Sequence, residues 1–248
     1  MGTSSDLQQR FGYSLIADTL DDGANATTGV DESACAVTGL YYTKFSSGTE
    51  RIVATCGNSF SYLNGTTWTE VSGIDVVITD GQNNQFVWTT ALDEIIGTND
   101  VNLPLRYNGT TLNTVDFTDL SVSNRPTAVK TVAFFKNFLI VANTVENSVS
   151  YPTRFRWSNV GTTSDWTDAN YVDIGALGGQ EINALAELYD NLYVFLTDSI
   201  YRVSFVAGAD TFNFSKVTDD IGSIAKNSVQ SITLSNAQNG LVFLDKDK

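Results

Sequence analysis

Apolar and polar residues alternate along most of this chain in short segments, which polar turns interrupt roughly every 8 to 15 residues. This two-residue period is typical of β-strands, and Asn-Gly, Asp-Gly and Ser-Gly turns favour antiparallel hairpins. The clearest unit spans residues 151–175, where Phe155 and Trp157 share one side of an extended segment. A Gly-containing turn then leads into a second segment that begins at Trp166. We predict an outer hairpin of a sheet here.

Weaker copies of this unit recur along the chain. Each copy begins with two largely apolar strands, then has a third strand that carries aromatic residues, and ends with a fourth strand. First strands start roughly every 43 to 54 residues, and four short strands per repeat of this length indicate a β-propeller blade. First and second strands are predicted at 37–43 and 51–55, 85–91 and 95–98, 128–134 and 138–142, 182–188 and 192–196, and 228–234 and 241–244.

Both ends of the chain fit this repeat. Arg10-Phe11-Gly12 resembles a third strand and residues 13–20 a fourth, whereas residues 228–248 supply only a first and second strand. We therefore predict an all-β fold, a five-bladed β-propeller of four-stranded antiparallel blades closed by pairing of the N- and C-terminal strands. Residues 1–20 would pair with residues 228–244. A sandwich of unrelated strands is the alternative.

The sequence also predicts the structure of one ambiguous segment and the positions of three loops. Residues 180–189 contain apolar residues at helical spacing, but these residues alternate equally well as a strand, and the repeat register favours the strand. Protruding loops are expected at residues 21–34, 99–104 and 143–153.

A tetrapeptide marks the turn after the third strand in two units. Asn64-Gly65-Thr66-Thr67 recurs as Asn108-Gly109-Thr110-Thr111. The first copy lies in a segment, residues 61–68, that resembles the Asp-box of sialidases, Ser-x-Asp-x-Gly-x-Thr-Trp, with Leu63 in place of the Asp. The box is a turn motif away from the catalytic centre of those enzymes, so it favours a hairpin and indicates no activity.

Length, composition and charge limit the kind of protein that this chain can be. A chain of 248 residues with 42% hydrophobic and 17% charged residues can form one large all-β domain over residues 1–248, and that domain could be part of a longer protein. The net charge of −14 disfavours tight nucleic-acid binding. No apolar run approaches the roughly 20 residues that cross a bilayer, so membrane insertion is not expected.

The cysteines leave two states open. Cys35 and Cys56 are the only cysteines, and both are expected on adjacent strands. We expect two reduced, packed thiols, with a disulfide between them as the alternative.

Little in the chain indicates catalysis or a cofactor. The chain has no histidine, which excludes His-based triads and His metal ligands. Nucleotide-binding glycine motifs, Cys-x-x-Cys and a complete EF-hand loop are also absent. Three acidic pairs could contribute to a calcium site but fit solvated turns better, so we expect no metal and no cofactor; the pairs are Asp21-Asp22, Asp219-Asp220 and Asp245 with Asp247.

Glycoside hydrolysis is the catalytic alternative that the fold prediction raises. Some five-bladed propellers are glycosidases with a pair of carboxylates in the central funnel. Asp93, Glu94 and Glu181 lie nearest the predicted first strands and could line an axial opening. The same positions suit turn residues, and nothing in the sequence tunes one carboxyl against another, so we expect no catalytic residues. Third-strand aromatics could stack on sugars, but packing between blades is the expected role.

The order of aromatic and glycine segments resembles a group of bacteriophage proteins. These are propeller-containing tail and neck components of short-tailed phages, including tail nozzle and packaged-DNA stabilisation proteins. The segments are Arg154-Phe155-Arg156-Trp157-Ser158, Asp165-Trp166, residues 180–185, residues 192–195, Ser199-Ile200-Tyr201, residues 221–225 and residues 240–244, with Asn99-Asp100, residues 104–109 and Pro126 upstream.

The resemblance implies a non-enzymatic structural subunit of a tail or head-to-tail connector. Such a subunit would form a homo-oligomeric ring around the DNA exit channel, contact other tail or neck proteins, and be located in the virion after synthesis in the host cytoplasm. The acidic composition agrees with this role, because an acidic wall repels DNA that must slide past it. A propeller that binds or cleaves glycans for attachment is the alternative.

Overall fold

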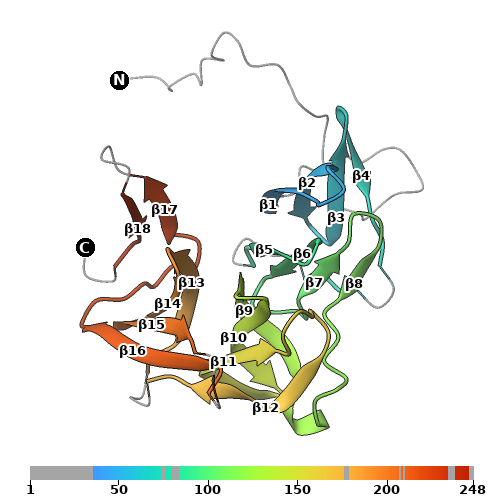
Figure 1. Ribbon diagram of the computed structural model, residues 1–248. Helices are drawn as coiled ribbons and strands as arrows, with labels where there is room; N and C mark the ends of the chain where they lie inside the picture. Colours follow the sequence, from blue (N-terminus) through green and yellow to red (C-terminus); the bar gives the residue numbers. More distant parts are fainter. Residues whose placement is uncertain are drawn as a thin grey trace, which may run out of the picture.

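A computed structural model describes residues 36–73, 76–79, 84–175, 179–206, 208, 210–233 and 238–245. This part of the chain forms four antiparallel four-stranded sheets and one two-stranded sheet (Figure 1). A 3₁₀ turn, η1 (Val122–Asn124), is the one helical element among these residues. The prediction of an all-β chain built from four-stranded antiparallel units is confirmed.

In each four-stranded sheet the strands lie side by side in chain order. The first two sheets contain β1 (Val37–Lys44), β2 (Glu50–Cys56), β3 (Ser59–Asn64), β4 (Thr67–Glu70), β5 (Val87–Ala91), β6 (Glu94–Thr98), β7 (Leu105–Tyr107) and β8 (Leu112–Thr114). The remaining sheets contain β9 (Pro126–Phe135), β10 (Phe138–Glu146), β11 (Val149–Ser158), β12 (Trp166–Asp173), β13 (Ile182–Leu188), β14 (Asn191–Leu196), β15 (Ser199–Phe205), β16 (Phe212–Asp219), β17 (Gln230–Thr233) and β18 (Asn239–Val242).

All ten predicted first and second strands are present in the described residues. The ambiguous segment 180–189 contains the strand β13, so the strand interpretation is confirmed. The outer hairpin predicted at residues 151–175 corresponds to β11 and β12, which pair with each other. The C-terminal region forms only the hairpin β17–β18 within the described part of the chain.

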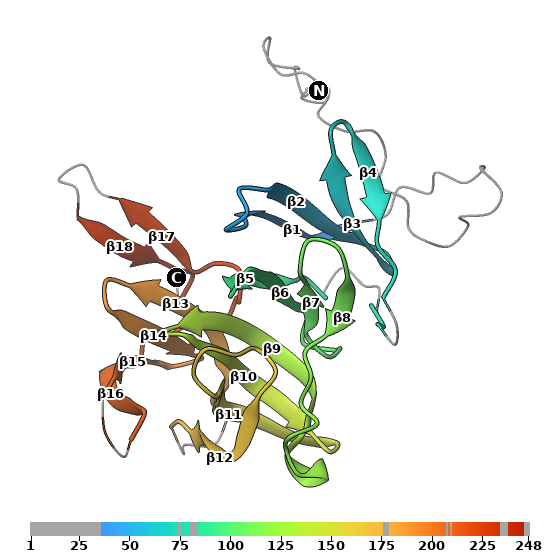
Figure 2. The same ribbon diagram turned by 45° about the vertical axis from the view of Figure 1, so that its right-hand side comes forward.

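The five sheets are arranged in an arc around a shared centre (Figures 1 and 2). The first strand of each sheet lies at its inner edge, where β5 contacts β1 and β9, and β13 contacts β9, β17 and β18. The arc begins with the sheet β1–β4 on the right of Figure 1 and ends with β17–β18 on the left. First strands therefore line the inside of the arc, and last strands form its outside.

Successive sheets pack face to face through separate apolar cores. One core joins the first and second sheets, another the second and third, another the third and fourth, and a smaller one the fourth sheet and β17–β18. In β14, Val194 packs toward the third sheet whereas its neighbour Phe195 packs toward β17–β18. Alternate residues thus enter different cores, which explains why strands buried on both faces are apolar throughout.

Aromatic residues of the third strands pack in these cores. Phe60, Tyr107 and Phe155 are at most 1% exposed. The ring of Phe60 lies 5.0 Å from that of Tyr107 in the neighbouring sheet. Their burial between sheets agrees with a packing role and leaves no ring face for a sugar.

The two-residue turns Leu92-Asp93, Lys136-Asn137 and Asn147-Ser148 have positive φ at both residues. This geometry is that of type I′ hairpin turns, whose twist matches the flanking strands. The last of these turns corrects one prediction. Residues 143–153 are not a protruding loop, because β10 and β11 continue as a long hairpin up to Asn147-Ser148.

The prediction for the cysteines is wrong in part, and several other predictions concern residues outside the described part of the chain. Cys56 is disulfide-bonded, so the expectation of a reduced thiol is wrong for it; Cys35, the other cysteine of the chain, lies outside the described residues. The predicted N-terminal strands, the loop 21–34 and Asp21-Asp22 also lie outside them, as does Asp247. In the described part of the chain, no helix combines the length and apolarity that crossing a bilayer requires.

Candidate functional site

The carboxylates considered for an axial opening do not come together as a pair. Asp93 lies in the β5–β6 turn, where it accepts hydrogen bonds from the backbone N–H of Ser46 at 2.8 Å and from the Ser46 hydroxyl. These hydrogen bonds, chiefly the one from the Ser46 hydroxyl and then the one from its backbone N–H, hold the pKa of Asp93 below its usual value. Since Ser46 belongs to the first sheet's β1–β2 turn, Asp93 joins two neighbouring sheets and does not line the centre.

Glu94 and Glu181 each have a basic partner. Arg106 Nε lies 3.7 Å from Glu94, which also accepts a 2.6 Å hydrogen bond from Thr163 of the third sheet. Lys130 Nζ lies 2.9 Å from Glu181, just before β13. Glu94 and Glu181 are therefore each paired with a neighbouring cation, and the contacts of Asp93 and Glu94 with neighbouring sheets do not support the alternative that these two residues line an axial opening.

The same end of each sheet carries contacts to the next sheet. Asp93 reaches Ser46 between the first and second sheets, and Lys136 pairs with Asp190 between the third and fourth. The hydroxyl of Tyr189 then donates to the backbone carbonyl of Asn239 at 3.1 Å, which joins the fourth sheet to β18. Equivalent turns thus repeat one kind of connection around the arc.

An axial cavity of about 590 Å³ opens among the first strands. All five sheets contribute to its wall, through β1, β5, β9, β13 and the segment that leads into β17. Asn227 donates a 3.1 Å hydrogen bond to Gln85, so the last sheet reaches the segment before β5 across this region. The centre of the arc is the one place in the described chain where every sheet meets the same space.

Four charged residues from different sheets interact with one another, and one of them, Lys226, lines this cavity. Burial raises the pKa of Asp100, while the charges of Lys130 and Lys226 oppose the rise. Burial likewise lowers the pKa of Lys226, against the attraction of Asp100. With Glu181 paired to Lys130, the cluster contains two cations and two carboxylates. The cluster is therefore neutral when all four groups are ionised.

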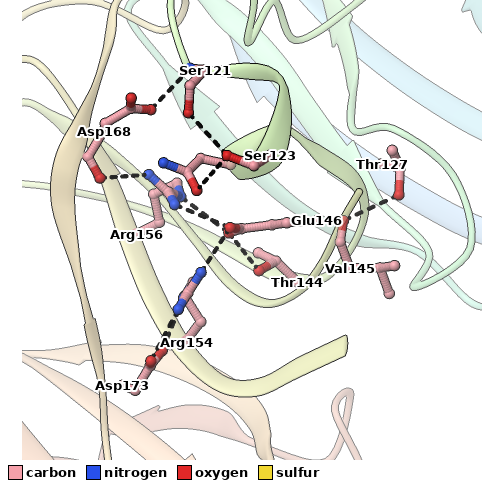
Figure 3. Close-up of polar contacts among 11 residues, drawn as sticks. Ser121, Ser123, Thr127, Thr144, Val145, Glu146, Arg154, Arg156, Asp168 and Asp173 are labelled. Atoms are coloured by element: carbon pink, nitrogen blue, oxygen red, sulfur yellow. Dashed lines mark hydrogen bonds and ion pairs between the residues drawn. The ribbon is translucent and has the colours of Figure 1, made fainter. Parts of the chain in front are cut away.

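A second polar network is buried inside the third sheet (Figure 3). Glu146 of β10, fully buried, accepts hydrogen bonds from Arg154 at 2.7 Å and from Arg156 at 3.2 Å. Thr144 donates to the same carboxylate at 2.9 Å, and Arg154 also binds Asp173 of β12 at 2.9 and 3.0 Å. One carboxylate thus bridges two guanidinium groups of the adjacent strand.

The network follows from strand alternation. Phe155 and Trp157 pack toward the fourth sheet, so Arg154 and Arg156 lie on the opposite face of β11. A β-bulge between Ala142 and Thr144 changes which residues of β10 share that face. Burial works against the charge of Arg154, but its hydrogen bonds to Asp173 and the charge of Glu146 raise its pKa overall. The sequence indicates the shared face of the two arginines, which alternate with two buried aromatics, but not their carboxylate partner on β10.

The ends of the arc expose apolar side chains that the interior sheets bury. On β1, Leu40 and Tyr42 are 64% and 55% exposed, whereas Tyr41 turns toward the second sheet. On the hairpin β17–β18, Ile232 and Val242 are 38% and 48% exposed and share the face that is turned away from the fourth sheet. Both terminal sheets therefore have one apolar face without a partner among the described residues.

The acidic pairs considered for calcium show other contacts. Asp219 lies 2.8 Å from Lys216 Nζ, and Asp245 accepts a 3.4 Å hydrogen bond from the backbone N–H of Gly222. Within the described ranges, no group of three acidic, histidine or cysteine residues is placed to hold a metal ion.

Comparisons with known proteins address the fold alone. No protein-family model and no curated protein matches the sequence. Among solved structures, a chain of polycomb repressive complex 2 from Chaetomium thermophilum is 9% identical, with a TM-score of 0.52 over 87% of this chain and 54% of that chain. The N-terminal domain of Nup159 is 8% identical, with a TM-score of 0.45 over 80% of this chain and 53% of that one. A computationally designed protein, Ika4, is 12% identical, with a TM-score of 0.40 over 74% of this chain and 92% of that one.

Proposed function

We propose that the chain is a five-bladed β-propeller that serves as a non-enzymatic structural subunit of a bacteriophage tail or head-to-tail connector. Several copies would form a ring around the DNA exit channel and contact other tail or neck proteins. The observation that carries this proposal is the repeated connection between neighbouring sheets, which includes an apolar core and a polar contact at each of the four junctions. Such repetition favours a stiff scaffold.

Closure of the ring is part of the proposal. Residues 1–20 would add two strands to the outer edge of β18, so that the last sheet gains the four strands of the others. The free edge of β18 supports this part of the proposal, because an unpaired sheet edge exposes backbone N–H and C=O groups that invite association.

Hydrogen exchange tests the closure directly. In the full-length chain, outward-facing amides of β18 (Asn239–Val242) should be protected from exchange, and deletion of residues 1–20 should remove that protection. Amides of β14 (Asn191–Leu196), in the middle of the fourth sheet, provide the control and should stay protected in both proteins. Equal protection of β18 in both proteins would contradict closure by the N-terminal segment.

The role in the virion rests on the resemblance to phage tail and neck proteins and on the net charge of −14. A wall of one sign repels DNA and so suits a conduit through which a genome slides. Cryo-electron microscopy of purified particles should show symmetric density for the chain around the tail axis. Particles that lack the chain altogether, or a chain that stays monomeric beside its virion neighbours, would contradict the proposal.

A propeller that binds or cleaves glycans is the second candidate, and the axial cavity favours it. The cavity wall includes the aromatic residues Tyr41, Phe86 and Trp88, whose rings stack on one another, and an aromatic wall is one feature of a sugar-binding site. Saturable binding on a glycan array, lost on replacement of Trp88, would support this candidate over the structural one.

A further inference from the structure

A lysine, an asparagine and a glutamate meet between the third and fourth sheets. Lys130 Nζ lies 2.9 Å from Glu181 Oε2, and Asn143 Nδ2 donates a 3.2 Å hydrogen bond to the same oxygen. The amide of Asn143 also donates to the backbone carbonyl of Ile182 at 3.0 Å. One carboxylate oxygen therefore holds a lysine amine and an asparagine amide next to each other.

The strand register explains why the amine and the amide are neighbours. The residue pairs on either side of them are in register, so Lys130 of β9 lies opposite Asn143 of β10. Opposite residues of an antiparallel pair have Cβ atoms about 4.5 to 5.5 Å apart. Asn143 also lies at the β-bulge between β10 and β11 and has a φ of 55°. Its amide thereby reaches the backbone of β13 in the fourth sheet.

The surroundings favour a reaction between the two side chains over free exchange with water. The side chain of Lys130 is 14% exposed, and Asn143 is 9% exposed. A lysine amine attacks a carbonyl carbon only after it has lost its extra proton, and Glu181 is in contact to accept that proton. The charge of Lys226 repels the ammonium form of Lys130. Glu181 itself is 45% exposed, which leaves a route to solvent for a small product.

We propose that Lys130 and Asn143 join in an intramolecular isopeptide bond with the help of Glu181. Glu181 takes one proton from Nζ of Lys130, and the free amine attacks Cγ of Asn143. Glu181 then gives its proton to Nδ2 and takes the second proton from Nζ, while the Cγ–Nδ2 bond breaks and its electron pair leaves with ammonia. The ammonia carries that second proton away as ammonium, and nothing is oxidised or reduced.

The bond would close the β9–β10 hairpin a second time, beyond the turn Lys136-Asn137. The first two strands of the third sheet could then not separate, even when the hydrogen bonds between them break. This reaction occurs once, on the chain itself, and it requires only one chain. It therefore depends neither on a ring of copies nor on the role in the virion.

Mass spectrometry of the denatured and reduced full-length chain tests the proposal. We expect a mass that is lower than that of the sequence by one ammonia. Trypsin should cleave after Lys136 but not after Lys130, because the amine of Lys130 is blocked. The tryptic peptides that carry Lys130 and Asn143 should remain joined after that cleavage, and fragmentation should locate the bond between these two side chains.

Three variants separate the roles of the side chains. Lys130→Met keeps the length of the side chain without an amine and should have the full mass of its sequence. Glu181→Gln keeps the shape but cannot take up the proton, so it should also have its full mass. Lys216→Met, which removes an exposed lysine paired with Asp219, is the matched control and should still lose one ammonia.

The wild-type chain decides the outcome even if a variant fails to fold. A folded wild-type chain with its full mass would overturn the proposal. So would a loss of ammonia without joined peptides, which indicates cyclisation of an asparagine with its own backbone, or a loss that persists in Lys130→Met. A cross-link that forms equally well in Glu181→Gln would overturn the role of Glu181.

Discussion

Replacing Glu146 by Gln should destabilise the protein more than any other single charge removal in the described residues. The carboxylate is 0% exposed and accepts hydrogen bonds from two arginines and a threonine. Gln keeps the shape but removes the charge, and its NH₂ group places a donor against guanidinium donors. After this change, Arg154 and Arg156 would differ in the partners that they keep.

The magnitude follows from those remaining partners. Arg154 keeps Asp173, with contacts of 2.9 and 3.0 Å. Arg156, itself 0% exposed, keeps a 3.4 Å hydrogen bond to the backbone carbonyl of Asp168 and a contact with the ring of Tyr171, 5.0 Å from its centroid, but no carboxylate partner within hydrogen-bond distance among those described. Removing one partner of a buried ion pair costs about 3 to 5 kcal/mol, because the other charge stays buried without compensation. Most of this cost should therefore arise at Arg156.

Urea unfolding followed by tryptophan fluorescence measures the change, since Trp157 and Trp166 are buried in the same sheet. Glu50→Gln is the matched control, because Glu50 pairs with Lys44 on the surface with both side chains more than half exposed. Exposed pairs contribute about 0 to 1 kcal/mol. A double variant, Glu146→Gln with Arg156→Met, should lose less than the sum of its two single changes.

Two results would refute this reasoning. If Glu146→Gln lies within about 1 kcal/mol of Glu50→Gln, the network does not hold the buried charges as described. If the losses of the two single variants simply add in the double variant, Glu146 and Arg156 are not coupled.

Three further predictions concern packing and pH. Gly222→Ala should cost about 1 to 3 kcal/mol in urea unfolding, because its Cβ would lie 2.2 Å from the Leu196 carbonyl oxygen, whereas Gly208→Ala meets nothing within 4 Å and should be nearly neutral. Trp166→Ala should cost about 3 to 5 kcal/mol, since the ring is 3% exposed and packs on an aromatic of the loop after β8; a melting temperature near that of the wild type would contradict it. Ser46→Ala removes the hydroxyl that lowers the pKa of Asp93, so it should lower the melting temperature at pH 7 but not below the folded-state pKa, where the carboxyl is protonated; an equal loss at both pH values would count against this.

The strand order could be predicted from the sequence because its period is local. First and second strands alternate apolar residues over short distances, and turns such as Lys136-Asn137 fix where each hairpin ends. The aromatic third strands marked the repeat for the same reason. These signals depend only on neighbours within one sheet.

The polar sites could not be predicted because they depend on neighbours in other strands and sheets. Glu146 was expected in a loop, since a charged residue favours water unless a partner compensates its burial, and its partners lie on the next strand. For Asp93 and Glu94 the sequence left an axial opening and turns open as alternatives, and in the structure Asp93 binds a turn of the preceding sheet and Glu94 a residue of the following one. The lysine of the axial cavity carried no local signal at all.

The two ends of the arc expose apolar side chains that an interior sheet would bury. Interior sheets bury apolar residues on both faces, so exposed Leu40 and Tyr42 on β1 and Ile232 and Val242 on the last hairpin are incompletely covered. Full burial of such a side chain contributes about 1.5 to 3 kcal/mol, and these four are on average about half exposed, so covering them would contribute roughly 3 to 6 kcal/mol, a substantial share of the net stability of a domain. In the proposed closure, a segment at the free edge of β18 would also lead back to β1. Residues 1–20 directly precede the chain segment that leads into β1, so a strand pair formed there would join both ends of the arc through a single ladder.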